Sequence, residues 1–284
     1  MKNFAIVANP SKSGSEQCAG EIIRILERNG CRCTACLLSE ENTGSSRYLY
    51  TDPVLVPADT EAVLAIGGDG TFIHATKDLI ELQLPVLGIN FGTLGYMTEV
   101  EVTGFEEALR SIMEGNCEIE ERMLLICDLI SKGNVISKGL AFNDIVLQRA
   151  LDTGIAQYDV IVDGHYLNTY SADGMILSTP TGSTGYNLSA GGPVVLPTSE
   201  IVLITPICAH TLNSRTIVLP ADVTIDIVSR ASGRGTGIFA TIDGEKGIHL
   251  GEGDSICASK ANAFARILRI NKMSFIEQLG KKMR

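Results

Sequence analysis

The chain has 284 residues and a formal net charge of −10 at pH 7, and this length suits one large domain or two modest ones. An acidic chain repels the phosphate backbone of nucleic acids, so the charge argues against non-specific nucleic-acid binding. No apolar run reaches about 18 residues, and the apolar N-terminal stretch is too short for a secretory signal. We therefore expect a cytoplasmic protein without a membrane segment.

The first hundred residues alternate between predicted strands and helices. Short apolar runs and apolar side chains at helical spacing predict strands over 4–8, 63–66 and 85–89 and helices over 16–28 and 72–82. Strands separated by helices favour a parallel, doubly wound sheet, in which ligands bind beyond the carboxyl ends of the strands. The sequence thus predicts an α/β nucleotide-binding domain over residues 1–99, with binding segments at Asn9-Pro10, 67–70 and 90–92.

The pattern changes after residue 100, where strand patterns become frequent and helical ones rare. A predicted helix over 104–114 is followed by predicted strands over 124–130, 139–147, 158–162, 174–178, 201–205, 216–219, 223–228, 237–242 and 255–260. Turn residues between them favour a β-sandwich-like domain over residues 100–261. We expect a short helix over 275–279, and we expect residues 262–284 to pack on a neighbouring subunit or back on the first domain.

The most informative motif is Gly67-Gly68-Asp69-Gly70-Thr71, which directly follows a buried-strand pattern. Glycine lets a backbone approach a ligand closely, and the N–H groups at the start of the next helix form a site for phosphate. A carboxylate is unusual in a phosphate site, so Asp69 needs a role: to remove a proton, to bind a hydroxyl or to hold a metal. A purely structural Gly-rich turn is the alternative interpretation.

Two further segments place polar groups among apolar ones. Residues 178–193 are dense in hydroxyls and glycines, a composition that suits phosphate and sugar oxygens. Asn143 and Asp144 interrupt an apolar strand pattern, and buried polar groups cost stability unless they are paired. We therefore expect these two residues to bind a ribose or an amide. The alternatives are a Ser/Thr-rich surface loop and a strand end that reaches solvent.

These motifs, in this order, resemble the NAD kinase family over residues 4–260. The matching segments are Asn9-Pro10, Gly67–Thr71, Asn143-Asp144, Asp173-Gly174 and Thr179–Pro193. The Gly-Gly-Asp-Gly-Thr element also occurs in lipid kinases of the diacylglycerol type and resembles that of phosphofructokinases. The Thr179–Pro193 segment is therefore the more specific part of the resemblance.

The resemblance implies transfer of the γ-phosphoryl group of ATP, or of polyphosphate, to the 2′-hydroxyl of the adenosine ribose of NAD, assisted by Mg²⁺ or another divalent cation. It implies Asp69 as the general base, a second domain that binds NAD, and subunits that associate through that domain as dimers or tetramers. No residue is assigned to the metal. The nucleotide-binding residues that it implies are Gly67, Gly68, Asp69, Gly70, Thr71, His74, Asn143, Asp144, Asp173, Thr184, Gly185, Tyr186, Asn187, Leu188 and Ser189.

Within the family pattern, Asn143 and Asp144 would hold the ribose and nicotinamide portions of NAD, and Asp173 would bind the nicotinamide amide. His74 stands where some members carry Arg, and it either touches a pyrophosphate or lies on a polar helix face. Ser171 replaces a basic residue of some members, which bears on the preference between NAD and NADH.

Four other charged residues have both a functional and a structural interpretation. Lys12 and Arg149 are either phosphate partners or solvated surface charges. Asp243 and Glu245 either line the cleft from the second domain or belong to a plain hairpin turn.

The eight cysteines do not suggest a disulfide framework, because such frameworks belong to short secreted chains. Cys31, Cys33 and Cys36 cluster, but no His or Cys nearby in the sequence completes a tetrahedral zinc set. We expect reduced thiols. The Gly-rich run 233–237 lies between apparent strands, where a hairpin loop is favoured over a dinucleotide-binding fingerprint.

Two other classes of function remain open. A lipid kinase would share the Gly67–Thr71 turn, but it would need an apolar acyl pocket and would not need the Thr179–Pro193 segment. A nucleotide sensor that has lost catalysis would bind without turnover, although the intact Asp69 weighs against it. The sequence leaves four properties open: whether the phosphoryl donor is ATP or polyphosphate, whether the acceptor is NAD or NADH, whether there is feedback control, and whether the assembly is a dimer or a tetramer.

Overall fold

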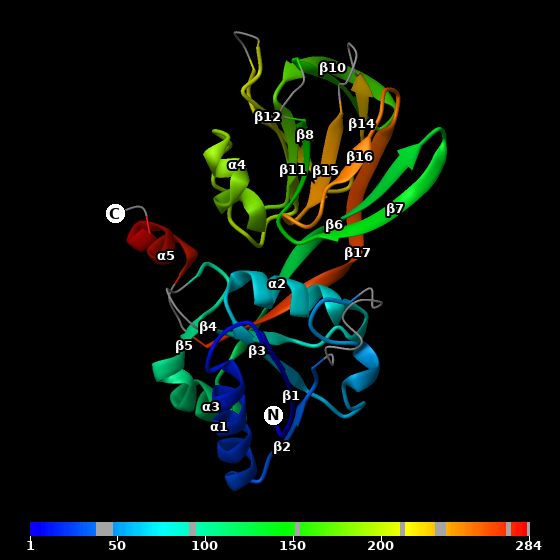
Figure 1. The fold of residues 1–284 in the computed structure, drawn as a ribbon. Coiled ribbons are helices and arrows are strands. Elements are labelled where there is room, and N and C mark those ends of the chain that lie inside the picture. Colours follow the sequence, from blue (N-terminus) through cyan, green and yellow to red (C-terminus); the bar gives the residue numbers. More distant parts are fainter. Residues whose placement is uncertain are drawn as a thin grey trace. The chain divides into compact units, whose positions relative to one another are not determined.

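The computed structural model describes residues 1–37, 48–90, 95–150, 154–210, 214–230, 237–270 and 274–282. The chain forms two compact units (Figure 1). Unit 1 comprises Met1–Glu121 and Ala263–Arg284, and unit 2 comprises Arg122–Asn262. The sequence predicts a boundary near residue 100. The boundary by contacts lies later because helix α3 (Phe105–Glu114) packs in the core of unit 1.

Unit 1 is built on a parallel sheet with the strand order β17-β4-β3-β1-β2. Its strands are β1 (Asn3–Ala8), β2 (Arg32–Ala35), β3 (Ala62–Gly67), β4 (Val86–Asn90) and the C-terminal part of β17 (Ser255–Arg269), and β5 (Val100–Glu101) pairs with β4. Every residue of β3 and β4 is buried, as expected for parallel strands that are covered on both faces.

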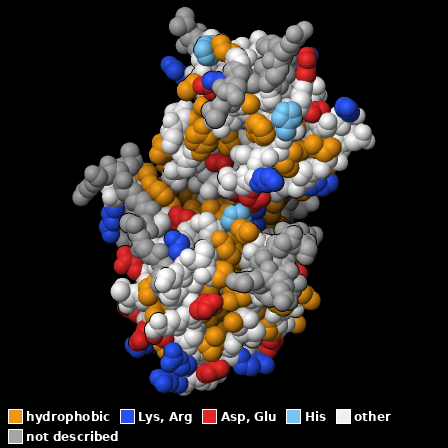
Figure 2. Space-filling view, in the orientation of Figure 1, with side chains coloured by type: hydrophobic (Ala, Val, Ile, Leu, Met, Phe, Trp, Pro, Cys, Tyr) orange, Lys and Arg blue, Asp and Glu red, His pale blue; other side chains and the backbone are white. Residues whose placement is uncertain are grey.

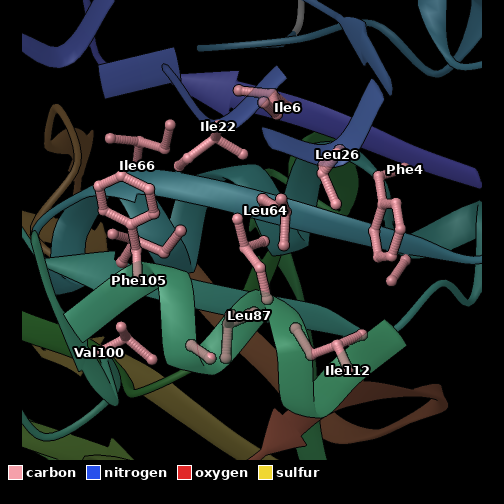
Figure 3. Packing of buried hydrophobic residues seen from close by; sticks show 14 of the residues in the cluster. Phe4, Ile6, Ile22, Leu26, Leu64, Ile66, Leu87, Val100, Phe105 and Ile112 are labelled. Carbon is pink, nitrogen blue, oxygen red and sulfur yellow. The ribbon is translucent and has the colours of Figure 1, made fainter. Parts of the chain in front are cut away.

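Helices cover both faces of this sheet, which confirms the predicted doubly wound α/β arrangement. They are α1 (Ser15–Arg28), α2 (Asp69–Asp78) and α3, with short 3₁₀ turns at Pro53–Leu55, Ile80–Leu82 and Val102–Gly104. Ile22 of α1 and Phe105 of α3 pack with Leu87 of β4 in one cluster (Figure 3). The next residue of β4, Gly88, faces α2 instead, because a Cβ there would lie 3.0 Å from Phe72.

The C-terminal part of the chain returns to unit 1. Gln83 Nε2 donates to the Phe264 carbonyl at 3.2 Å, and Arg266 Nη1 donates to the Gln83 carbonyl at 3.0 Å. The Glu99 carboxylate lies 2.6 Å from Arg269 Nε and accepts from the Ile270 N–H at 2.8 Å. The segment ends in helix α5 (Phe275–Lys282).

The described part of unit 2 is all β except for a 3₁₀ turn at Thr181–Thr184 and the short helix α4 (Tyr186–Ser189). A six-stranded antiparallel sheet has the order β13-β12-β11-β8-β15-β16, and β10, β9, β14 and β17 pair in that order as a second antiparallel set. The strands are β6 (Glu118–Ser131), β7 (Asn134–Ala141), β8 (Asp144–Arg149), β9 (Ala156–Val162), β10 (His165–Ala172), β11 (Gly174–Ser178), β12 (Ile201–Ile207), β13 (Ile217–Pro220), β14 (Ile225–Arg230), β15 (Ile238–Ile242) and β16 (Ile248–Leu250). Strand β6 begins at the end of unit 1 and forms a hairpin with β7.

Two predicted elements differ in the structure. The single strand predicted over 139–147 is wrong, because β7 ends at Ala141 and β8 begins at Asp144. The helix predicted over 72–82 begins earlier, at Asp69, and its last residues form a separate 3₁₀ turn. The sequence also misses β2, β10 and β16, whose residues are too polar or too few to give an apolar pattern.

Acidic and basic side chains are interspersed over the face in Figure 2. Among the described residues, no helix has both the length and the apolar character needed to cross a membrane. The Gly-rich run 233–237 lies outside the described residues except for Gly237, and so do Phe91 and Gly92 of the predicted segment 90–92.

Candidate functional site

In unit 1 the predicted motif lies at the carboxyl edge of the parallel sheet. Strand β3 ends at Gly67, and α2 starts at Asp69 with Gly68 as its N-cap. The Asp69 carboxylate accepts hydrogen bonds from three consecutive backbone N–H groups, those of Tyr96 at 2.8 Å and of Met97 and Thr98 at 3.1 Å. The Thr98 hydroxyl donates to the same carboxylate at 3.2 Å. The acid is therefore held by the chain that follows β4.

Two glycines are required by this packing. A Cβ on Gly95 would lie 1.8 Å from Asp69 Oδ1, and a Cβ on Gly67 would lie 2.3 Å from Thr71 Oγ1. Distances below 3.0 Å cannot be accommodated without a shift of the neighbour. Gly67 thus allows the strand to turn into α2, whereas Gly95 allows the backbone to close over the carboxylate. Gly70 is exposed, and a Cβ there would have open space.

Asn9, at the end of β1, connects this motif to its surroundings. Its amide Nδ2 donates to Thr71 Oγ1 at 3.1 Å and to the Tyr50 hydroxyl at 3.2 Å. The Tyr50 ring meets the His74 ring edge-on, with 6.1 Å between their centroids. The structure thus brings His74 beside the residues of the Gly67–Thr71 turn. Lys12 is exposed, and its carbonyl accepts from the Ser15 N–H at 3.0 Å.

Asp78 holds Tyr50 in place at the other end of α2. Its carboxylate accepts from the backbone N–H groups of Leu49, Tyr50 and Thr51 at 2.8–3.2 Å. Burial raises the pKa of Asp78, against the lowering effect of these three donors. We therefore interpret Asp78 as a structural residue that holds the backbone of residues 49–51, and not as a ligand-binding residue.

In unit 2, Asn143 and Asp144 lie at a break between β7 and β8 that a distant carboxylate stabilises. Asp243 accepts from the N–H groups of Phe142 at 2.8 Å, Asn143 at 2.7 Å and Asp144 at 3.1 Å. Asp243 has a φ of 49° in the Asp243-Gly244 turn after β15. It is thus a hairpin residue that also binds the strand opposite it. These bonds explain why the apolar pattern of 139–147 does not continue as one strand.

The hydroxyl-rich loop 178–193 meets Asn143 directly. Thr179 donates from its N–H to the Asn143 carbonyl at 2.9 Å and from its hydroxyl to the Phe142 carbonyl at 2.7 Å. A Cβ on Gly182 would lie 2.1 Å from the Asn143 oxygen. The two motifs that the sequence identified separately therefore pack directly against each other in unit 2.

The side chains of this loop divide into an inner and an outer set. Asn187 is fully buried: its amide donates to the carbonyls of Ser183 at 3.2 Å and Pro193 at 3.1 Å, and it accepts from the Thr205 hydroxyl at 2.6 Å. Asn187 therefore holds the loop together from inside. The predicted residues that remain accessible are Thr184, Gly185, Tyr186, Leu188 and Ser189. Tyr186 to Ser189 form the short helix α4.

Asp173 lies at the opposite end of β11, where it is paired. Arg149 Nε donates to Asp173 Oδ1 at 2.7 Å, and both side chains are about one-third exposed. The Tyr158 hydroxyl donates to the Asp173 carbonyl at 3.4 Å. Ser171 accepts through its carbonyl from the His210 N–H at 2.8 Å. Arg149 is thus a partner of Asp173 rather than a solvated charge.

Asp144 is the most perturbed acid of unit 2. Only 7% of its surface is exposed, and burial, followed by the charge of Asp243, raises its pKa to about 7. Its carboxyl receives no hydrogen bond from any residue that the structure describes. A buried carboxyl without donors favours its neutral form.

No three His, Cys, Asp or Glu side chains of the described chain group as metal ligands. All eight cysteines are free thiols. Burial raises the pKa of Cys33 to about 12, with further contributions from Cys36 and Cys31. The raised pKa values of Cys33 and Cys36 favour their protonated thiols, which are poor nucleophiles.

Sequence reasoning missed the residues that hold the acids in position. Thr98 and the N–H groups of 96–98 have no pattern of their own in the sequence. Asp243 did have one, because an Asp-Gly pair between two strand patterns marks a tight turn. The sequence does not show that the Asp243 side chain also accepts hydrogen bonds from the backbone of residues 142–144.

Two family models match the chain. The ATP-NAD kinase N-terminal domain matches residues 4–117, and the ATP-NAD kinase C-terminal domain matches residues 142–270. A NAD kinase from Lachnospira eligens is 40% identical over 294 aligned positions, covering 100% of both chains. A NAD kinase from Lachnoclostridium phytofermentans is 36% identical, covering 99% of both.

Solved structures show the same fold. A yeast NADH kinase complexed with NADH has a TM-score of 0.84 and 26% identity, covering 100% of this chain and 87% of the other. A NAD kinase from Archaeoglobus fulgidus in complex with ATP has a TM-score of 0.74 and 24% identity, covering 98% of each chain.

Proposed function

The chain belongs to the NAD kinase family, and from this premise we propose that it transfers the γ-phosphoryl group of ATP to the 2′-hydroxyl of the adenosine ribose of NAD. The products are NADP and ADP. The observation that carries the proposal is the Asp69 carboxylate, held at the start of α2 by three backbone N–H groups. It lies at the carboxyl edge of a parallel sheet, where such folds bind ligands.

Asp69 acts as the general base in this proposal. A ribose hydroxyl is a poor nucleophile at neutral pH, and a carboxylate within hydrogen-bond reach takes its proton as the new bond forms. The bond from O2′ to the γ-phosphorus forms while the bond from that phosphorus to the β,γ-bridging oxygen breaks, and ADP leaves. The rest of catalysis is positioning and charge neutralisation. The N–H groups of the first turn of α2 have no partner within the helix and favour phosphate oxygens.

Unit 2 supplies the NAD site in this proposal. Asn143 and Asp144 bind the ribose and nicotinamide portions, and Asp173 binds the nicotinamide amide with its second oxygen, since Arg149 occupies the first. Tyr186 and Ser189 contact adenine and ribose from the exposed side of α4. The contacts of Thr179 and Gly182 with Asn143 support this grouping, because they fix the loop against the acid and amide pair.

Mg²⁺ is part of the proposal, although the described residues offer no group of three ligands. Mg²⁺ commonly keeps several waters and binds through substrate phosphates with one or two carboxylates, so a protein cage is not needed. When bound, it would neutralise phosphate charge. Polyphosphate as an alternative donor and a homodimer or homotetramer as the working assembly come from the family resemblance alone.

A direct assay tests the function. The full chain is incubated with Mg²⁺ and either ATP or polyphosphate, and with NAD, NADH or diacylglycerol as the acceptor. We expect NADP from ATP and NAD. Phosphorylation of the lipid with no NADP would reject the proposal, and tight NAD binding without any turnover would favour a sensor. Light scattering on the same sample measures the assembly.

A further inference from the structure

Asp144 and Asp243 are adjacent acids in very different surroundings. Asp243 accepts three backbone N–H groups, two at Oδ1 and one at Oδ2. Asp144 is 7% exposed, and no described residue donates a hydrogen bond to its carboxyl. A proton on the Asp144 carboxyl competes with no existing hydrogen bond, because this carboxyl has no N–H donor among the described residues.

We propose that Asp144 binds the dinucleotide as a neutral carboxylic acid, donating its O–H to an uncharged acceptor atom of NAD, beside Asp243, whose carboxylate accepts the backbone N–H groups of residues 142–144. This inference rests on the proposed function. A carboxylate can only accept hydrogen bonds, whereas a carboxylic acid can donate one. The same position would therefore recognise a different set of ligand atoms in each protonation state.

The surroundings of Asp144 support the neutral form. Burial and the charge of Asp243 both raise its pKa. Strand β11, which pairs with β8 at Ser178↔Asp144, has no charged residue, and the loop 178–193 has none either. The charged groups on the neighbouring elements are Asp243, Glu245 and Lys246 after β15, Arg149 at the far end of β8, Lys138 of β7, and Arg122, which contacts Thr181 at 3.3 Å.

Calorimetry of NAD binding to the full chain, without ATP, tests the inference between pH 5.5 and 8.5. If only the neutral acid binds, and its pKa in the free protein is about 7, the dissociation constant should rise about tenfold between pH 6 and pH 8. Repeating the titration at pH 8 in buffers with different ionisation enthalpies counts the protons taken up, and we expect close to one per NAD.

Two variants complete the test. Asp144→Asn replaces the acid with a neutral donor of the same shape, so its dissociation constant should not vary with pH and proton uptake should disappear. Asp222→Asn, at an exposed acid after β13, should keep the wild-type pH dependence. Proton uptake that persists in Asp144→Asn would assign the proton to another group, such as His74 or His210, and would overturn the inference.

The wild-type measurement decides the question even if Asp144→Asn does not fold, because a pH-independent constant with no proton uptake contradicts the proposal by itself. Its failure differs from that of the proposed function. A protein that makes NADP but binds NAD without taking up a proton refutes the neutral acid alone. A protein that neither binds NAD nor makes NADP refutes the function.

Discussion

Asp243 Oδ1 accepts a hydrogen bond from the backbone N–H of Asn143 at 2.7 Å, across one hundred positions of sequence. The same arrangement occurs three times in the described chain: Asp69, Asp78 and Asp243 each accept from three consecutive backbone N–H groups. Asp69 and Asp243 fix irregular backbone next to a strand, and Asp78 fixes the segment before the 3₁₀ turn at Pro53–Leu55. Backbone outside helices and strands needs such acceptors, because its N–H groups have no partner in a regular hydrogen-bond pattern.

Replacing Asp243 should therefore destabilise unit 2. Asp243→Ala leaves the N–H groups of 142–144 without their acceptor, and an unsatisfied buried donor costs about 1–3 kcal/mol. Urea unfolding should show at least that loss of the free energy of unfolding, together with weaker NAD binding. Asp222→Ala serves as the control, since Asp222 is exposed. Equal stability of the two variants would show that the bonds to Asp243 contribute little.

Asp69→Asn should lower the turnover number by roughly 10²–10⁴-fold, the usual contribution of a general base, and should retain NAD binding. An amide with its oxygen in place of Oδ1 keeps the bonds from Met97 and Thr98 but loses the bond from the Tyr96 N–H, because the amide NH₂ cannot accept it, so the fold should survive with some loss of stability. Steady-state kinetics and calorimetry on the same preparation check both parts. A turnover number within tenfold of wild type would remove Asp69 from the role of base.

Gly95→Ala tests the contact that positions this acid. The added methyl would lie 1.8 Å from Asp69 Oδ1, so the carboxylate or the backbone must move, and we expect turnover to fall at least tenfold even if the protein remains folded. Gly20→Ala in α1 is the matched control because its methyl meets open space. That variant should gain up to about 1 kcal/mol of stability from helix propensity. Similar kinetics for the two variants would contradict the role of Gly95.

The sequence predicted the parallel sheet, both of its layers of helix and the β-rich second half, because buried parallel strands appear as uninterrupted apolar runs. Strand β3 is such a run. The sequence did not predict β10, because its first four residues are all exposed and the strand lacks a regular alternation of buried and exposed side chains. It also identified Asn187 as a ligand contact, whereas its amide bonds Ser183 and Pro193 inside the loop. Local patterns reveal polar residues in unusual places, but the direction of each side chain depends on long-range packing.

The stability of the protein should depend on pH through Asp144. Its pKa rises on folding from an ordinary 3.8 to about 7, so the folded state binds more protons than the unfolded state between these values. Stability attributable to this group should therefore fall as the pH rises from about 4 to 7, by up to about 1.4 kcal/mol per pH unit, and should level off above pH 7.

Asp144→Asn isolates this contribution, because an amide does not titrate. The free energy of unfolding of the variant minus that of wild type should increase steadily between pH 4 and pH 7, because wild type loses stability over this range, and should then stay constant. Urea unfolding at half-unit intervals of pH measures the difference. If the difference in free energy of unfolding does not change over this pH range, Asp144 has an ordinary pKa in the folded state. Burial beside Asp243 would then not raise its pKa.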